Sequence, residues 1–283
     1  GDLPEAKRPV IPGHQGVGVV DTLGPGCTRL RMGDRVGIAW LRHTCGACDY
    51  CRRGSENLCE GARFTGYHAD GGYAEYAVVP EGYAYEIPDC FADEEAAPLL
   101  CAGIIGYRAL CRCNLPAGGT LALYGFGSSA HVVFQIARHR GHRVFVVSRG
   151  GGHQQHARDM GAAWAGDNPA EMPEPADAAI FFAPVGHLVP GALEHLRKGG
   201  TLAIAGIHLT DIPRLEYERH LFYERDLRSV TANTRDDGVG LLRAAAEAGV
   251  RPHVTTYPLE DANAALQDMK ADRINGTGVL VMG

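Results

Sequence analysis

The sequence predicts an α/β protein with a doubly wound parallel sheet and a second, mostly β part. From about residue 117 onward, apolar strands alternate with helices, which is typical of a parallel sheet buried on both faces. Between residues 10 and 40, short β segments alternate with glycine-containing turns. The 283 residues are enough for two domains.

The expected elements follow from this pattern. In the first part we expect strands at 17–20, 33–38 and 71–79, and a helix at 93–100 whose first three residues are acidic and favour the helix dipole. In the alternating part the expected strands cover 121–124, 144–147, 178–182 and 201–205, and the expected helices cover 130–140, 153–160 and 189–197. Toward the C-terminus we expect helices at 240–248 and 259–271 and strands at 254–257 and 277–282.

Composition limits the classes of partner. The net charge of −6 and the pI of about 6.1 give no general attraction to nucleic acids or anionic membranes. No apolar run of about 20 residues suggests a membrane span, and no secretory signal is recognisable, so we expect a cytoplasmic protein. In a reducing compartment, nine cysteines favour metal binding over disulfides. The arginines near four of these cysteines suggest a zinc ribbon that binds nucleic acid, but the acidic balance disfavours it.

Four cysteines have the spacing of a metal site. They follow the pattern C-x2-C-x2-C-x7-C and are Cys45, Cys48, Cys51 and Cys59. Four thiolates at this density can surround one zinc ion tetrahedrally and leave no open position. The sequence therefore predicts a structural zinc in a lobe that covers about residues 41–63.

A glycine-rich turn predicts a dinucleotide site. Gly125, Gly127 and Ala130 form the pattern G-x-G-x-x-A directly after an expected strand. The glycines allow a tight turn and close approach of a pyrophosphate, and the alanine allows close packing of the following helix. Ser128 and Ser129 open that helix, where free N–H groups and the helix dipole favour a phosphate.

The end of the next expected strand bears on the choice of coenzyme. NAD sites usually carry Asp or Glu there, whereas this chain has Ser148 followed by Arg149. A carboxylate would repel a 2′-phosphate, while a hydroxyl and a guanidinium would bind one. We therefore expect NADP(H) rather than NAD(H), with a merely solvated Arg149 as the alternative.

Several motifs in one order resemble a known family. They are residues 12–20 around His14, the four-cysteine lobe, and residues 70–76, 99–103 and 125–127. Together they resemble the zinc-containing medium-chain alcohol dehydrogenases over essentially the whole chain. Residues 206–213 and 229–233 are similar to those of a bacterial subgroup.

The resemblance implies an arrangement of domains and partners. A Rossmann domain, residues 102–234, would be inserted into a mostly β, GroES-like catalytic domain made of residues 1–101 and 235–283. The family forms dimers and tetramers, so a homodimer or homotetramer is expected. The implied substrate is a small alcohol or aldehyde.

The resemblance also implies a catalytic zinc beside the structural one. His14 and Cys101 align with two of its ligands, and a buried structural role is the alternative for each. The family's third ligand, a cysteine, lies upstream of His14, so we expect that the chain shown lacks an N-terminal segment. Gln15 stands where the family usually has a glutamate close to the zinc.

The implied activity is reversible, zinc-dependent hydride transfer between NADP(H), or NAD(H), and an alcohol or aldehyde. Ala205, Gly206 and Ile207 fall where the family contacts the nicotinamide through backbone groups. The alternative is a nucleotide- and zinc-binding fragment without activity, because one catalytic ligand is absent.

Overall fold

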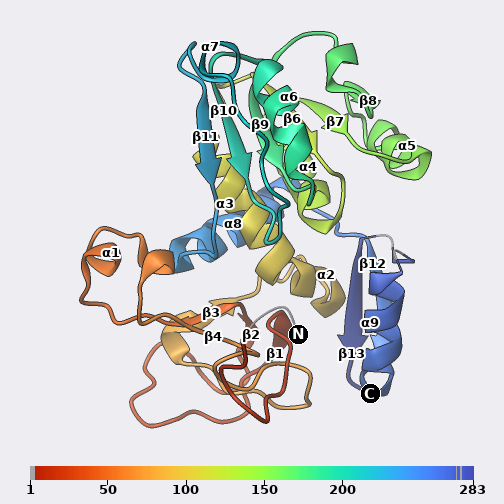
Figure 1. Cartoon of the computed structure of the whole chain (residues 1–283). Helices are drawn as coiled ribbons and strands as arrows, with labels where there is room; N and C mark the ends of the chain where they lie inside the picture. Colours follow the sequence, from red (N-terminus) through yellow and green to blue (C-terminus); the bar gives the residue numbers. More distant parts are fainter. Residues whose placement is uncertain (1–3, 272, 275) are drawn as a thin grey trace. The chain divides into compact units, whose positions relative to one another are not determined.

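A computed structural model describes residues 4–271, 273–274 and 276–283. The chain divides into two compact units (Figure 1). Unit 1 comprises Gly1–Ile104 and Ala232–Gly283, and unit 2 comprises Ile105–Thr231. Within the described residues, no helix is both long enough and apolar enough to cross a membrane.

Unit 2 is built on a six-stranded parallel sheet with the order β11-β10-β9-β6-β7-β8. Its strands are β6 (Thr120–Tyr124), β7 (Arg143–Val147), β8 (Trp164–Gly166), β9 (Ala176–Phe181), β10 (Leu196–Ile204) and β11 (Asp226–Ser229). All five residues of β6 are buried, as expected for a central strand covered on both faces. The strand order reverses between β6 and β9, and ligands of such sheets bind beyond the carboxyl ends of the strands at this point.

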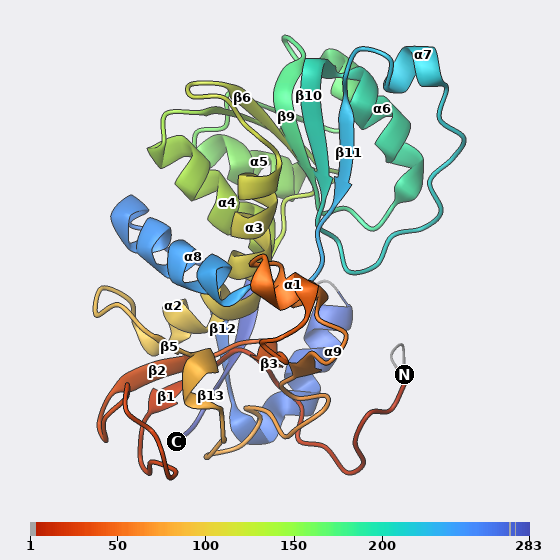
Figure 2. The ribbon, with the colours of Figure 1, turned by 90° about the vertical axis from the view of Figure 1, so that its left-hand side faces the viewer.

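Helices cover both faces of this sheet. They are α3 (Ile104–Arg112), α4 (Ser128–His139), α5 (Gly151–Asp159), α6 (Val189–Glu194) and α7 (Tyr217–His220), with the 3-10 turns η4 (Pro169–Glu171) and η5 (Gly186–Leu188). Figure 2 shows α4 and α5 on one side of the sheet and α6 on the other. Apolar residues of the sheet, among them Phe145, Phe181 and Leu202, pack with Leu193 of α6 in one buried cluster. The predicted doubly wound sheet is therefore confirmed.

The described residues of unit 1 form three smaller sheets. An antiparallel sheet has the order β1-β2-β5, β3 pairs with β4, and β12 pairs in parallel with β13. The strands are β1 (Gly16–Val19), β2 (Arg35–Ile38), β3 (Leu41–His43), β4 (Arg63–Phe64), β5 (Ala84–Glu86), β12 (Val254–Pro258) and β13 (Thr277–Val281). The helical elements are α1 (Asp49–Arg52), η1 (Glu56–Leu58), η2 (Glu81–Tyr83), α2 (Asp93–Pro98), η3 (Leu99–Gly103), α8 (Arg235–Ala248), η6 (Leu259–Asp261) and α9 (Ala262–Lys270).

Several expected elements differ in the structure. The strand predicted at 71–79 is wrong: this segment is irregular, and Tyr76 and Val78 are 75% and 80% exposed. Among the described residues, no strand forms a ladder with this segment. The helix predicted from 240 begins at Arg235, because Thr234 caps it and accepts a hydrogen bond from the Asp237 N–H. The helix predicted to reach 197 ends at Glu194, since β10 starts at Leu196.

Because α3 packs closely on α4, we expect a side chain at Gly106 to destabilise the protein. A Cβ there would lie 2.6 Å from Val133 Cγ2 and 3.1 Å from the Ser129 carbonyl oxygen. We expect Gly106→Ala to lower the free energy of unfolding by about 1–3 kcal/mol through overpacking. Gly191 of α6 is the matched control, since a Cβ there meets no described atom within 4 Å. Gly191→Ala should raise that free energy by roughly 0.5–1 kcal/mol. Urea denaturation measures both, and equal stability of the two variants would contradict this packing argument.

Candidate zinc and dinucleotide sites

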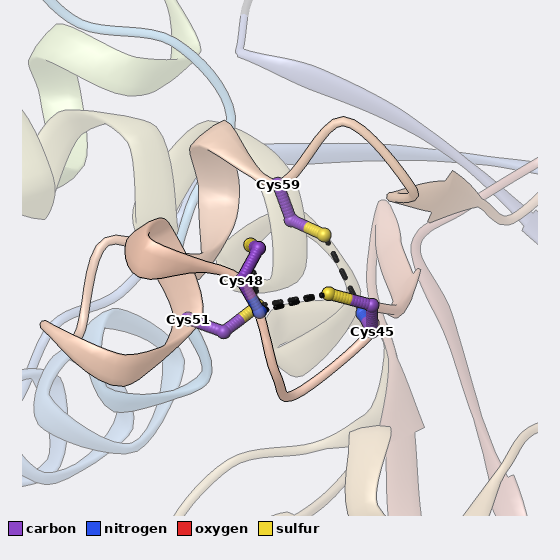
Figure 3. A group of neighbouring side chains, drawn as sticks. All are labelled: Cys45, Cys48, Cys51 and Cys59. Atoms are coloured by element: carbon purple, nitrogen blue, oxygen red, sulfur yellow. Dashed lines mark hydrogen bonds between the residues drawn. The ribbon is translucent and has the colours of Figure 1, made fainter.

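The four cysteines of the lobe converge on one point (Figure 3). Their Sγ atoms all lie within 4.8 Å of one another. The Cys48 N–H donates to Cys45 Sγ at 3.3 Å, and the Cys45 N–H donates to Cys59 Sγ at 3.4 Å. Such N–H···S bonds stabilise thiolates, which are the form that binds metal.

The lobe has little apolar packing of its own. None of the four residues of α1, which carries Cys51, is buried. Backbone hydrogen bonds at Ala47 and Cys48 lower the pKa of Cys45, while partial loss of hydration raises the pKa of Cys51. Thiolates this close repel one another unless a cation lies between them. A tetrathiolate set suits zinc, and these four cysteines form the structural zinc site.

A second pair of zinc-type donors lies elsewhere in unit 1. His14 Nε2 and Cys101 Sγ are 3.1 Å apart, although 87 residues separate them in the chain. Cys101 belongs to η3, a π-helical turn in which the Ile104 N–H donates to the Leu99 carbonyl. Single π-turns of this kind are frequent at functional sites. The ring of Trp40 contacts His14 edge-on, with centroids 4.9 Å apart, and holds the imidazole plane.

Burial keeps both donors neutral without metal. It lowers the pKa of His14, and it raises the pKa of Cys101 to about 11. Near pH 7 the imidazole therefore has a free lone pair, while the thiol must lose its proton when a metal binds. The pair suits zinc chemistry, with proton release coupled to metal binding.

The residues around His14 and Cys101 supply only part of a zinc ligand set. Among the described residues, the four-cysteine lobe is the only group of three or more His, Cys, Asp or Glu ligands, so no third such ligand joins His14 and Cys101. The side-chain oxygen of Gln15, however, is buried without a hydrogen-bond partner among these residues. An orphaned acceptor beside a ligand fits a bound cation or a water molecule. His14 also lines an open groove of about 1120 Å³ between β1 and residues 72–81 of unit 1.

The glycine-rich turn has the geometry that a pyrophosphate requires. Gly125 follows β6 with φ +91°, and a Cβ there would come within 3.2 Å of the Ala183 nitrogen. A Cβ at Gly127 would meet no described atom within 4 Å, so the space before α4 is open. Helix α4 begins at Ser128, continues through Ser129, and directs the N–H groups of its first turn into this space. Ala130, fully buried, allows the close packing expected of it.

Ser148 and Arg149 lie at the end of the neighbouring strand. β7 pairs with β6 so that Val147 lies opposite Tyr124, which places Ser148 beside Gly125. Ser148 is buried, and its carbonyl accepts from Gln154 Nε2 at 2.9 Å. Arg149 is exposed. The Arg149 guanidinium is therefore available to an anionic ligand at this edge of the sheet.

Ala205, Gly206 and Ile207 follow β10 at the same edge of the sheet. The Ala205 N–H donates to the Phe181 carbonyl at 2.9 Å and fixes the segment against β9. Ile207 is 98% exposed. Because all strands are parallel, these residues share the carboxyl edge with Gly125 and Ser148.

The sequence did not predict one polar contact near the zinc lobe. Glu56 of η1 accepts hydrogen bonds from Arg235, which is 179 residues away. Burial alone would raise the pKa of Glu56, but the hydrogen bonds from Arg235 outweigh it and lower this pKa. Neither residue belongs to a motif, so the sequence held no signal for the contact.

Comparison with known proteins identifies the family. Residues 1–89 match the model "Alcohol dehydrogenase GroES-like domain". Over 287 residues the chain is 54% identical to the "Probable alcohol dehydrogenase AdhA" of Mycobacterium tuberculosis (strain CDC 1551 / Oshkosh), and the match covers 100% of this chain and 83% of that protein. The chain belongs to the zinc-containing medium-chain alcohol dehydrogenase family. The resemblance predicted from the motifs is thus confirmed.

Solved structures agree with this family. A cobalt- and zinc-bound thermostable alcohol dehydrogenase from Pyrobaculum aerophilum is 28% identical with a TM-score of 0.86, and the match covers 99% of this chain and 85% of that one. A zinc-binding dehydrogenase from Sinorhizobium meliloti 1021, bound to NADP, is 25% identical with a TM-score of 0.81 over 93% of this chain and 81% of that one. This chain therefore combines a GroES-like part, which carries the zinc lobe, with a Rossmann part.

The lobe predicts a defined loss of metal on substitution. In Cys51→Ser the site loses one of four thiolates, so we expect the zinc content to fall by one per chain and the peptides of residues 41–63 to become protease-sensitive. Metal analysis by mass spectrometry measures the first effect. Cys90→Ser, an exposed cysteine outside the lobe, is the control and should retain all zinc. Unchanged zinc content in Cys51→Ser would contradict the assigned site.

Proposed function

We propose that the chain catalyses reversible, zinc-dependent hydride transfer between NADP(H) and a small alcohol or aldehyde. The supporting observation is the approach of His14 Nε2 and Cys101 Sγ to 3.1 Å in a member of this family. In this proposal residues 1–101 and 235–283 form the catalytic domain, and residues 102–234 form the coenzyme domain.

Each proposed group has a role that its surroundings support. His14 and Cys101 would hold the catalytic zinc, and Trp40 orients the imidazole. A bound zinc supplies a Lewis acid for the substrate oxygen, and a bound nicotinamide supplies or accepts the hydride. With two protein donors from the described chain, coordination positions remain for substrate and for a further ligand.

The coenzyme proposal rests on the carboxyl edge of the parallel sheet. Gly125, Gly127 and the N–H groups of Ser128, Ser129 and Ala130 would bind the pyrophosphate. Ser148 and Arg149 would bind the 2′-phosphate of NADP(H), and the backbone at 205–207 would contact the nicotinamide. The related Sinorhizobium meliloti dehydrogenase was solved with NADP, which supports the same choice here.

The second candidate function is a nucleotide- and zinc-binding fragment without catalytic activity. The observation that favours it is the absence of a third His, Cys, Asp or Glu beside His14 and Cys101 among the described residues. The structural zinc and the glycine-rich turn would be unaffected in such a fragment.

Metal content and activity separate the two candidates. We expect two zinc ions per wild-type chain, and one in His14→Ala and in Cys101→Ser. Loss of a Lewis acid worth several kcal/mol should lower NADPH-dependent aldehyde reduction by roughly 100-fold or more in both variants. The exposed Cys90→Ser is again the control. A wild-type chain with one zinc that binds NADPH without reducing aldehydes would support the binding-only fragment.

Coenzyme preference tests Arg149 directly. The wild type should have a lower Michaelis constant for NADPH than for NADH. Arg149→Gln removes a charge-assisted hydrogen bond of about 1.5–3 kcal/mol, so the constant for NADPH should rise about 10–100-fold while that for NADH stays unchanged. Arg149→Lys keeps the charge and should recover part of the loss. A wild-type preference for NADH, or an equal effect on both coenzymes, would exclude this role.

A further inference from the structure

The contact between Glu56 and Arg235 connects two parts of unit 1 that are far apart in sequence. We propose that this pair couples the zinc occupancy of the four-cysteine lobe to the order of residues 232–237, where the chain re-enters unit 1 and helix α8 begins. Glu56 and Arg235 would then be positioning residues, and the structural zinc would hold the start of α8 as well as the lobe. The inference does not depend on the proposed reaction.

Several hydrogen bonds join Glu56 to Arg235. Glu56 is 8% exposed. Its Oε1 accepts from the backbone N–H of Arg235 at 2.8 Å and from Nε at 2.9 Å, and its Oε2 accepts from Nη2 at 2.7 Å. One carboxylate therefore fixes both the main chain and the planar side chain of Arg235. Charge-assisted, two-pronged bonds of this type are strong and geometrically specific.

The carboxylate is tied closely to the metal ligands. Glu56 lies between Cys51 and Cys59, and its carbonyl accepts from the Cys59 N–H at 3.0 Å. At the other end of the lobe, Thr44 directly precedes Cys45. A rearrangement of the thiolates would therefore also move Glu56, which lies between two of the ligands, and Thr44, which adjoins a third.

Arg235 also contacts the opposite end of the lobe through Tyr83. Its guanidinium lies over the Tyr83 ring, 4.9 Å from the centroid. The Tyr83 hydroxyl shares a 2.8 Å hydrogen bond with Thr44 Oγ1, and both residues are buried. The lobe is thus joined to Arg235 from both of its ends.

On the helix side, Glu56 supplies a cap. The Arg235 N–H is the first of α8 and has no partner within the helix, so the carboxylate satisfies it. A negative charge at this end also favours the helix dipole. Thr234 and Asp237 cap each other's N–H groups and complete the turn.

The residues just before α8 need such support. Ala232 adopts φ +48°, a left-handed conformation that costs energy for a residue with a Cβ. Asn233 is buried, and its Nδ2 donates to the Thr234 carbonyl at 3.0 Å. A strained segment of this kind persists only where its surroundings hold it. Asn233 also donates to the Tyr85 hydroxyl at 3.4 Å, and Glu56 holds the main chain at Arg235.

Thermodynamic coupling must be reciprocal. If zinc holds Glu56 in place, zinc removal should increase opening of residues 232–237. Breaking the pair should in turn weaken zinc binding in the lobe by a similar factor. This reciprocity separates coupling from two independent structural roles.

The experiment combines hydrogen exchange with zinc competition. Exchange of residues 232–238 is followed by mass spectrometry in the zinc-loaded full chain and after chelation, and the lobe's affinity is measured against a chelator. Cys101→Ser is the common background, so that the zinc measured is that of the lobe. The variants are Arg235→Gln, Arg235→Lys and Glu56→Gln. Arg243→Gln is the control, because Arg243 lies on α8 with a side chain that is 76% exposed.

We expect zinc removal to speed exchange at 232–238 about tenfold or more in the background chain. Arg235→Gln and Glu56→Gln should show the same fast exchange with zinc bound and a lobe affinity reduced about tenfold or more. Arg235→Lys should be intermediate, and Arg243→Gln should match the background. Unchanged zinc affinity in Arg235→Gln would overturn the proposal, as would exchange that rises only in the lobe after chelation. If chelation unfolds the chain globally, the variants' zinc affinities decide.

Discussion

The convergence of four thiolates on one point is the constraint on which much of unit 1 depends. Residues 45–59 bring too little apolar surface together to form a core, since the residues of α1 are not buried. A zinc ion replaces that core, because it binds the thiolates and removes their repulsion. The ordered lobe then presents Glu56 to Arg235 and Thr44 to Tyr83. A local metal site thereby fixes segments that are nearly two hundred residues apart.

Unit 2 is stabilised by the burial of apolar surface, and its proposed coenzyme site results from the order of its parallel strands. Its strands are apolar and buried, and burial of such surface is the dominant favourable term in folding. Because all six described strands run parallel, their carboxyl ends lie at one edge. Gly125, Ser148 and Ala205 each follow a different strand and share this edge for that reason alone. The coenzyme site that we propose is therefore a consequence of strand order, with Arg149 added for selectivity.

The sequence predicted what is local or strongly patterned. The family, the fold class and the four-cysteine zinc site follow from short motifs and apolar strands, and these predictions are confirmed. The strand predicted at 71–79 is wrong because alternation shows only a capacity to pair, and no described strand pairs with this segment. Glu56 and Arg235 could not be found, because a contact across 179 residues depends on the tertiary fold. The proximity of His14 to Cys101 likewise came from family resemblance, since no spacing rule joins residues 87 apart.

The most direct test of the account follows the hydride itself. NADPH that carries deuterium at both hydrogen positions of the nicotinamide C4 would be mixed with the zinc-loaded chain and a simple aldehyde, and the products analysed by mass spectrometry. The account predicts an alcohol with one deuterium on the former carbonyl carbon, formed together with NADP⁺. Bound NADPH and bound zinc with no deuterium in any alcohol product would contradict it.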